Sequence, residues 1–177
     1  MKKKSALLLF TLFLSACLTV SCGNESNSSV LPFNTTNIYG QQVTQKILED
    51  YDLTMINVWG TWCHSCIEEL PDLATAHSML PKNVNLISIC EDAGQDEETL
   101  AAAKEIARTN NVSFQVLIPD EDLTESIVST VITFPTTIFV DSNGNEVGQR
   151  IIGVPNTESI ADYYLLQVHT RLEMMGK

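Results

Sequence analysis

Two cysteines separated by two residues are the part of this chain best suited to chemistry. Cys63 and Cys66 lie in the segment Trp62-Cys63-His64-Ser65-Cys66, between an apolar run and a stretch with helical spacing. This placement predicts Cys63 at a helix N-terminus, where unpaired backbone N–H groups and the helix dipole stabilise a thiolate and lower the pKa of the thiol. Cys66, one turn further on, could then attack a mixed disulfide at Cys63 and release the substrate. We therefore expect thiol-disulfide exchange at this pair.

The elements that must position this pair follow from the spacing of apolar residues. A near-continuous apolar run at 53–59 predicts a central strand buried on both faces. The residues after the cysteines have helical spacing to about Met79, interrupted by Pro71, which should kink the helix. Acidic residues near Asp96 favour the first turn of a crossover helix. The remaining predicted elements are strands at 84–90, 114–118, 137–140 and 146–152, helices at 121–130 and 157–172, and an Asn-Gly turn at 143–144.

The composition fits one domain with a sizeable core, because the chain has 177 residues, 44% of them hydrophobic. The formal net charge is −12, and without Lys2, Lys3 and Lys4 it becomes −15, from 7 basic and 22 acidic residues. Such an acidic surface repels nucleic acid, so a nucleic-acid partner is not expected. Residues 33–51 contain a turn signal and a short helix-compatible stretch, and we expect them to cover a sheet edge.

The N-terminus has the pattern of an export signal. A basic start is followed by an apolar run from Ala6 to Val20, shorter than the roughly 20 residues of a membrane-spanning helix. Both Leu14-Ser15-Ala16-Cys17 and Thr19-Val20-Ser21-Cys22 resemble a bacterial lipoprotein processing site. We favour Cys22, because cutting before Cys17 would leave a second exposed thiol on the exported chain. An ordinary cleaved secretory signal is the alternative. The predicted division is a signal and lipidation site at 1–22, a flexible tether at 23–32 and one domain at 33–177.

Two motifs together resemble the TlpA/ResA-like branch of the thioredoxin superfamily. The first is N-V-W-G-T-W-C-H-S-C-I-E-E-L-P-D-L at 57–73, and the second is F-P-T-T-I-F-V-D at 134–141, followed by Gly144. The resemblance covers roughly residues 33–172. It implies an α/β thioredoxin-like fold, with a mixed central sheet flanked by helices, an N-terminal extension and a βα insertion. It also implies an exported, often lipid-anchored thiol-disulfide oxidoreductase that needs no cofactor.

The resemblance extends to individual site residues. It implies that Pro135 is cis and faces the two cysteines, with the backbone beside it pairing to an extended substrate segment. We expect Trp62, His64, Phe134 and Thr136 on the substrate-facing surface, although Thr136 also suits an ordinary strand position. Glu69, one helical turn after Cys66, either exchanges a proton with that thiol or is a solvated helix residue.

Four residues qualify this interpretation. Asn57 stands where thioredoxins carry a buried acid, and we expect it to be a buried hydrogen-bonding group. A protonated His64 beside Cys63 would favour the thiolate and make the couple more oxidising. Trp59 and Cys90 are expected in the core.

Three functions remain open at this point. The leading hypothesis is an enzyme at the outer face of the bacterial cell membrane, or in a periplasm, that reduces disulfides in exported proteins such as apocytochromes during cytochrome c maturation, with electrons from a membrane donor. A disulfide oxidase or isomerase with the same site is the second. The third is a non-catalytic metal-binding lipoprotein using Cys63, Cys66, Cys90 and His77, although a second closely spaced ligand pair is missing. A peroxidase is disfavoured because no Pro-x-x-x-Thr-x-x-Cys pattern surrounds Cys63.

Overall fold

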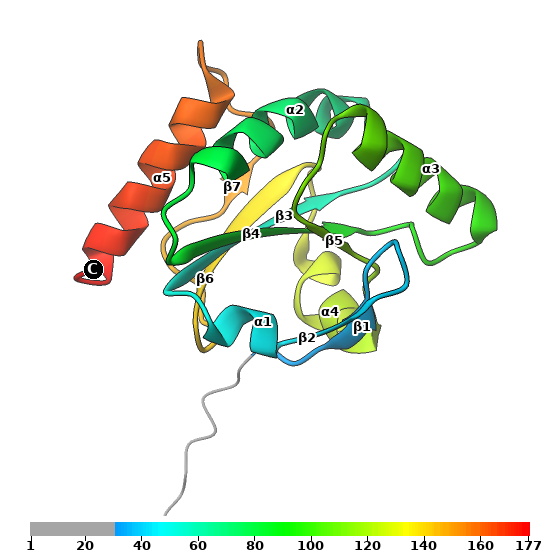
Figure 1. The fold of residues 1–177 in the computed structure, drawn as a ribbon, viewed down its shortest axis with the longest axis horizontal. Coiled ribbons are helices and arrows are strands. Elements are labelled where there is room, and N and C mark those ends of the chain that lie inside the picture. Colours follow the sequence, from blue (N-terminus) through cyan, green and yellow to red (C-terminus); the bar gives the residue numbers. More distant parts are fainter. Residues whose placement is uncertain (1–30) are drawn as a thin grey trace, which may run out of the picture.

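A mixed five-stranded sheet forms the centre of the protein in a computed structural model that describes residues 31–177 (Figure 1). The predicted lipidation sites Cys17 and Cys22 lie outside the described residues, as does most of the predicted tether. The sheet order is β5-β4-β3-β6-β7, with β3 parallel to β4 and antiparallel to β6. Its strands are β3 (Leu53–Trp59), β4 (Val84–Cys90), β5 (Gln115–Leu117), β6 (Thr136–Asp141) and β7 (Ile151–Ile152).

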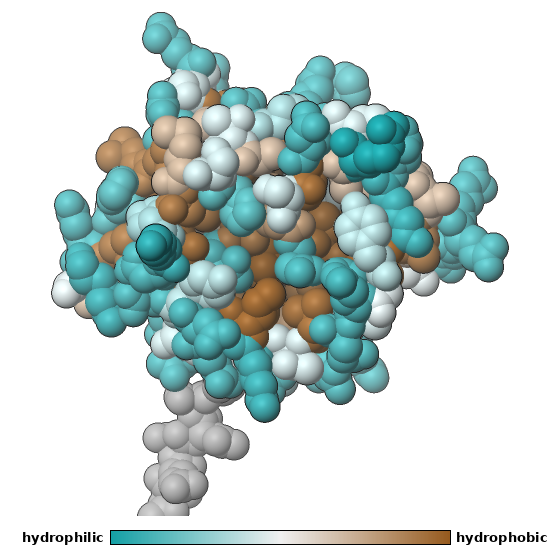
Figure 2. Space-filling view, viewed as in Figure 1, coloured by the Kyte–Doolittle hydropathy of each residue, from teal (hydrophilic) through white to brown (hydrophobic). Residues whose placement is uncertain are grey.

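Helices cover both faces of the sheet. In Figure 1, α2 (His64–Met79), α3 (Glu97–Thr109) and α5 (Ile160–Met174) lie above and beside it, and α1 (Lys46–Glu49) and α4 (Glu121–Ser126) lie below. The alternation of β3 explains this layering, because Met55 and Trp59 join the core under α2 and α5, whereas Ile56 and Val58 join the opposite core. Seen from this side, hydrophobic residues gather near the middle of the surface and hydrophilic ones around them (Figure 2).

The N-terminal hairpin protects one edge of the sheet. It consists of β1 (Asn34–Thr36) and β2 (Gln42–Thr44) and docks on β5. The amide of Ile38 donates to the Val116 carbonyl, and the amide of Ile118 donates to the Thr36 carbonyl, both at 2.9 Å. These bonds satisfy backbone groups that an exposed edge strand would present to other chains. The expectation that residues 33–51 cover a sheet edge is therefore confirmed for the hairpin, whereas Leu48 of α1 packs in the core on one face of the sheet.

The fold class and the two central strands, 53–59 and 84–90, are confirmed, and the elements that differ do so for local reasons. The predicted helix at 121–130 ends at Ser126, and a separate 3₁₀ turn follows at Val128–Thr130. The last helix starts at Ile160 rather than at 157, because the Ser159 side chain caps its N-terminus by accepting a hydrogen bond from the Asp162 amide.

The predicted return strand at 146–152 was mostly wrong. Only a bridge between Glu146 and Val140 and the short β7 pair with β6. The buried guanidinium of Arg171 in α5 donates to the carbonyls of Val147 and Gln149 and lies 3.7 Å from the Phe139 ring centroid. Backbone acceptors that a regular strand would use are thus bonded to a side chain from the last helix. Within residues 31–177, none of the helices has the length and apolar content to cross a membrane.

Candidate active site

The two cysteines lie where β3 passes into α2, and they are joined by a disulfide. Cys63 is the N-cap residue of α2, with extended backbone angles, and its sulfur accepts a hydrogen bond from the Cys66 amide at 3.3 Å. Both side chains are buried. The sulfur of Cys63 therefore sits at the end of the helix where backbone N–H groups lack helical partners, the position that stabilises a thiolate after reduction.

The loop before β6 lies beside the cysteine loop. The peptide bond between Phe134 and Pro135 is cis, as the resemblance implies. The Phe134 ring packs edge-on against the Trp62 ring, with centroids 5.2 Å apart. The carbonyl of Pro135 accepts a hydrogen bond from the Gly153 amide at 2.8 Å, which ties the loop to the end of β7. Trp62 is 61% exposed, so an aromatic surface borders the redox pair.

Glu69 faces the interior, which excludes the solvated alternative. Its side chain is only 1% exposed, and its Oε1 accepts a hydrogen bond from the Tyr164 hydroxyl at 2.7 Å. Asn57 Nδ2 lies 3.4 Å from the other carboxylate oxygen and donates to Thr137 at 3.0 Å, and Thr137 lies 3.1 Å from the Tyr164 hydroxyl. The four side chains come from α2, β3, β6 and α5 and form one closed, buried network.

This network tunes the acidity of Glu69. Burial raises the pKa of Glu69 from its usual 4.5 to about 7, although hydrogen bonds from Tyr164 and Asn57 act in the opposite direction. Glu69 is one turn from Cys66 on α2, and both face inward. A buried carboxylate that titrates near neutrality is suited to proton exchange with a thiol. Sequence reasoning found Asn57 and Glu69 but missed the roles of Thr137 and Tyr164. Thr137 lies inside the quoted motif at 134–141, and Tyr164 has no local signal.

Two of the expected substrate-facing side chains already have polar partners within the protein. His64 is 87% exposed, and its Nε2 lies 3.2 Å from Oε1 of Glu68, so the imidazole pairs with a carboxylate of the next turn. Thr136 is buried, and its hydroxyl donates to the carbonyl of Thr133 at 2.7 Å. The Thr136 side chain therefore matches the alternative of an ordinary strand residue, with its hydroxyl already satisfied.

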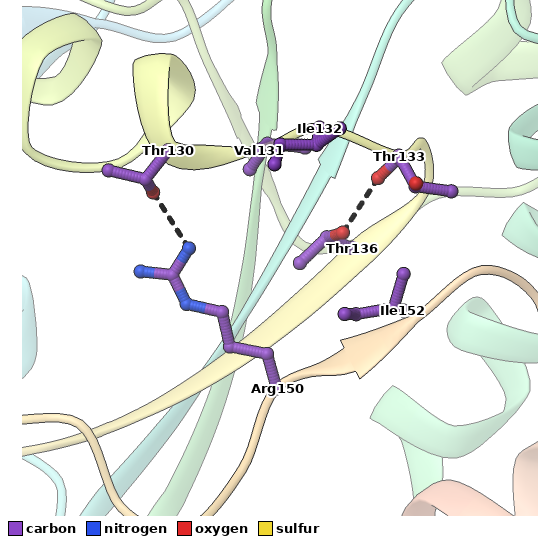
Figure 3. A pocket seen from close by; sticks show the side chains of 7 residues that line it. All are labelled: Thr130, Val131, Ile132, Thr133, Thr136, Arg150 and Ile152. Carbon is purple, nitrogen blue, oxygen red and sulfur yellow. Dashed lines mark hydrogen bonds between the residues drawn. The ribbon is translucent and has the colours of Figure 1, made fainter.

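A small pocket lies beside the loop that precedes β6 (Figure 3). It is lined by residues 130–133, Thr136, Arg150 and Ile152. Ile132 on its rim is 96% exposed, and Ile152 is also exposed. Arg150 donates to the Thr130 hydroxyl at 2.7 Å and pairs with Glu146, so its charge is compensated. The pocket offers a partner an apolar rim rather than a free charge.

The ligands of the metal-binding hypothesis are not brought together. Cys90 is buried and donates its thiol proton to Asp92, and burial raises the pKa of the Cys90 thiol, which matches the core position expected for it. His77 lies 2.9 Å from the Ser113 hydroxyl. In the part of the chain that the structure describes, no group of three or more His, Cys, Asp or Glu side chains is placed to hold a metal ion. Trp59, also expected in the core, is fully buried.

A thioredoxin-like sheet that carries a Cys-x-x-Cys disulfide at the start of a helix, beside a cis-proline loop, defines a thiol-disulfide oxidoreductase. The chain belongs to the AhpC/TSA family, whose model matches residues 27–146. It is 30% identical over 134 residues to the thiol-disulfide oxidoreductase ResA of Bacillus anthracis, covering 74% of this chain and 72% of that protein. It is 31% identical over 126 residues to the thiol:disulfide interchange protein DsbE of Pseudomonas fluorescens, covering 69% and 64%.

Solved structures show the same fold. A secreted disulfide oxidoreductase of Mycobacterium tuberculosis superposes with a TM-score of 0.62 at 21% identity, covering 79% of this chain and 96% of that one. The exposed lipoprotein thioredoxin of Streptococcus pneumoniae superposes with a TM-score of 0.59 at 20% identity, covering 77% and 98%. The relationship to ResA, together with the cysteine pair and this fold, makes the protein an enzyme of the thiol-disulfide oxidoreductase class.

Proposed function

We propose that this oxidoreductase reduces disulfide bonds of exported proteins by cycling the Cys63–Cys66 pair between dithiol and disulfide. The observation that carries the proposal is the buried carboxylate of Glu69 one turn from Cys66. An ionised carboxylate here disfavours a second negative charge on the sulfurs, and so disfavours the reduced, thiolate-bearing form of the enzyme. Destabilising the reduced form lowers the reduction potential and favours transfer of electrons to a substrate.

The reaction proceeds in two exchanges. The Cys63 thiolate attacks one sulfur of the substrate disulfide, the substrate S–S bond breaks, and the departing substrate sulfur takes up a proton. Cys66 passes its proton to ionised Glu69 and attacks the Cys63 sulfur, which closes the enzyme disulfide, breaks the bond between Cys63 and the substrate, and expels the second substrate sulfur as a thiolate. Glu69 then gives up the proton through solvent, and the thiolate becomes a thiol. Two electrons and two protons pass from enzyme to substrate, and a membrane donor then restores the dithiol. Because the pKa of Glu69 is about 7, both the ionised and the protonated carboxyl are populated near neutral pH.

We place the enzyme outside the cytoplasm, held at the outer face of the membrane by a lipid on Cys22 or, alternatively, Cys17. The support is the leader pattern of residues 1–22, together with the resemblance to a secreted oxidoreductase and an exposed lipoprotein thioredoxin. Its substrates would be exported proteins with disulfides, apocytochromes of cytochrome c maturation among them. Trp62, Phe134 and the apolar rim at Ile132 would contact the substrate segment beside Pro135.

The opposite direction, disulfide formation or isomerisation, is the second candidate. His64 favours it, since a cation near Cys63 stabilises the thiolate. The pairing of His64 with Glu68 weakens this argument, because the imidazole charge is then offset by a carboxylate. The potential of the cysteine couple, measured by equilibration with glutathione, separates the two. A value near or below roughly −270 mV supports the reductase, and one near roughly −120 mV supports the oxidase.

Cysteine variants test the assignment of roles. We expect Cys63→Ala to abolish reduction of insulin disulfides, because the attacking sulfur is lost. We expect Cys66→Ala to accumulate mixed disulfides with substrate, visible on non-reducing gels, because nothing resolves them. Cys90→Ala is the matched control and should retain activity, since that thiol is buried. Full turnover by the Cys63 variant would refute the assignment.

A further inference from the structure

The segment that leads into Cys63 is held from the side by the end of β4. The amide of Glu91, the residue after this strand, donates to the Trp59 carbonyl at 2.9 Å and extends the pairing of β4 with β3. This places Glu91 and Asp92 beside residues 60–62. Asp92 is 4% exposed, and its carboxylate accepts hydrogen bonds from the Thr61 amide at 3.0 Å and from the Thr61 hydroxyl. The backbone that precedes Trp62 is thus fixed.

The Trp62 side chain is held although it is exposed. Its indole Nε1 donates to Oε1 of Glu91 at 2.7 Å. The ring also lies directly over Gly60, where a Cβ atom would come within 2.7 Å of the indole nitrogen. Phe134 contacts the ring edge-on from the opposite loop. Gly60, Glu91 and Phe134 therefore confine the indole from three directions.

We propose that Glu91 is a positioning residue that holds the Trp62 indole as a preformed wall of the surface that a substrate polypeptide contacts. This inference rests on the proposed function, because it assigns a role in binding protein disulfides. An indole that is already ordered loses no rotamer freedom when a partner packs on it, so binding costs less entropy. Gly60 serves the same end by leaving room for the ring. Electron transfer between the two sulfurs needs neither residue.

A positioning role for Glu91 predicts a change in the KM for a protein substrate without a change in the reduction potential of the Cys63–Cys66 couple. With insulin as protein substrate, Glu91→Ala should raise KM roughly two- to tenfold, the range expected for one newly mobile large side chain, with kcat unchanged. Gly60→Ala should act in the same direction, because the added methyl group displaces the indole. Glu91→Gln replaces the carboxylate by an amide whose oxygen can still accept the hydrogen bond from the indole N–H, so this variant should behave like the wild type. The comparison of the two variants separates the effect of the hydrogen bond from that of the charge.

Two measurements make the test complete. Acrylamide quenching of fluorescence reports on Trp62, since Trp59 is fully buried, and should increase in the Glu91→Ala protein and not in the Glu91→Gln protein. The reduction potential of the couple against glutathione should be the same in all variants. Glu125→Ala, which removes an exposed glutamate of α4, serves as control for the loss of one surface charge and should match the wild type.

The proposal is overturned by an unchanged insulin KM and unchanged quenching in the Glu91→Ala protein. It is also overturned if Glu91→Gln is as defective as Glu91→Ala. If the wild-type protein itself does not reduce insulin, the proposed function fails. The quenching experiment then tests the role of Glu91 alone, and equal quenching in the wild type and the Glu91→Ala protein would show that Glu91 does not hold the indole in place.

Discussion

Replacing Glu69 by glutamine should remove a pH-dependent loss of stability from the oxidised protein. The pKa of Glu69 is about 7 in the fold, against an ordinary value of 4.5. Between these values the unfolded chain has released the proton and the folded protein retains it, so the free energy of unfolding falls as pH rises. At 1.36 kcal/mol per pKa unit, the loss is about 3 kcal/mol between pH 4.5 and pH 7, and it stays nearly constant above that.

Urea unfolding of the disulfide form at half-unit steps from pH 4 to pH 8.5 measures this effect. The other titrating groups are shared by both proteins, so the difference between the wild-type and Glu69→Gln curves isolates the buried carboxylate. We expect the wild-type protein to lose about 3 kcal/mol relative to the variant across this range. Glu125→Gln, an exposed substitution in α4, should run parallel to the wild type. Parallel curves for Glu69→Gln and wild type would show that the fold does not hold the proton, and the reasoning would be refuted.

Two other substitutions probe the same framework. Tyr164→Phe removes a hydrogen bond that lowers the pKa of Glu69, so the pH at which insulin reduction reaches half its maximum should move upward; a pH–rate profile identical to the wild type would contradict the proton role. Arg171→Ala leaves the carbonyls of Val147 and Gln149 without their donor and should lower the free energy of unfolding by roughly 2 to 5 kcal/mol in urea. The exposed Arg108→Ala serves as its control, and equal effects of the two substitutions would count against the carbonyl bonds.

The parts of the fold that were predictable are those with a local cause. The strand at 53–59 was evident because a strand buried on both faces needs apolar residues at nearly every position. The position of Cys63 at a helix start followed from the strand before it and the helical spacing after it. The prediction of a return strand at 146–152 was mostly wrong because carbonyls in this segment accept hydrogen bonds from Arg171, more than twenty residues away. No local sequence pattern indicates such a bond.

In the candidate site, too, the features with a local cause could be predicted and those that depend on tertiary packing could not. The chemistry of the cysteine pair could be inferred from residue type and spacing. The orientation of Glu69 could not, because it depends on the packing of α5 against α2, which brings Tyr164 to the carboxylate from 95 residues away. The contact of Trp62 with Glu91 is equally invisible, since it depends on the pairing of two parallel strands.

The hydrogen bonds from Arg171 to the chain after β6 make the support of the cis-proline loop depend on a helix that comes later in the sequence. Arg171 of α5 anchors the stretch that leads into β7, and Gly153, the residue after β7, donates a hydrogen bond to the carbonyl of Pro135. A growing polypeptide emerges N-terminus first, so residues 63–66 are synthesised before α5. The cis-proline loop therefore has its full set of supporting bonds only once α5 has docked and Arg171 has reached the carbonyls of Val147 and Gln149.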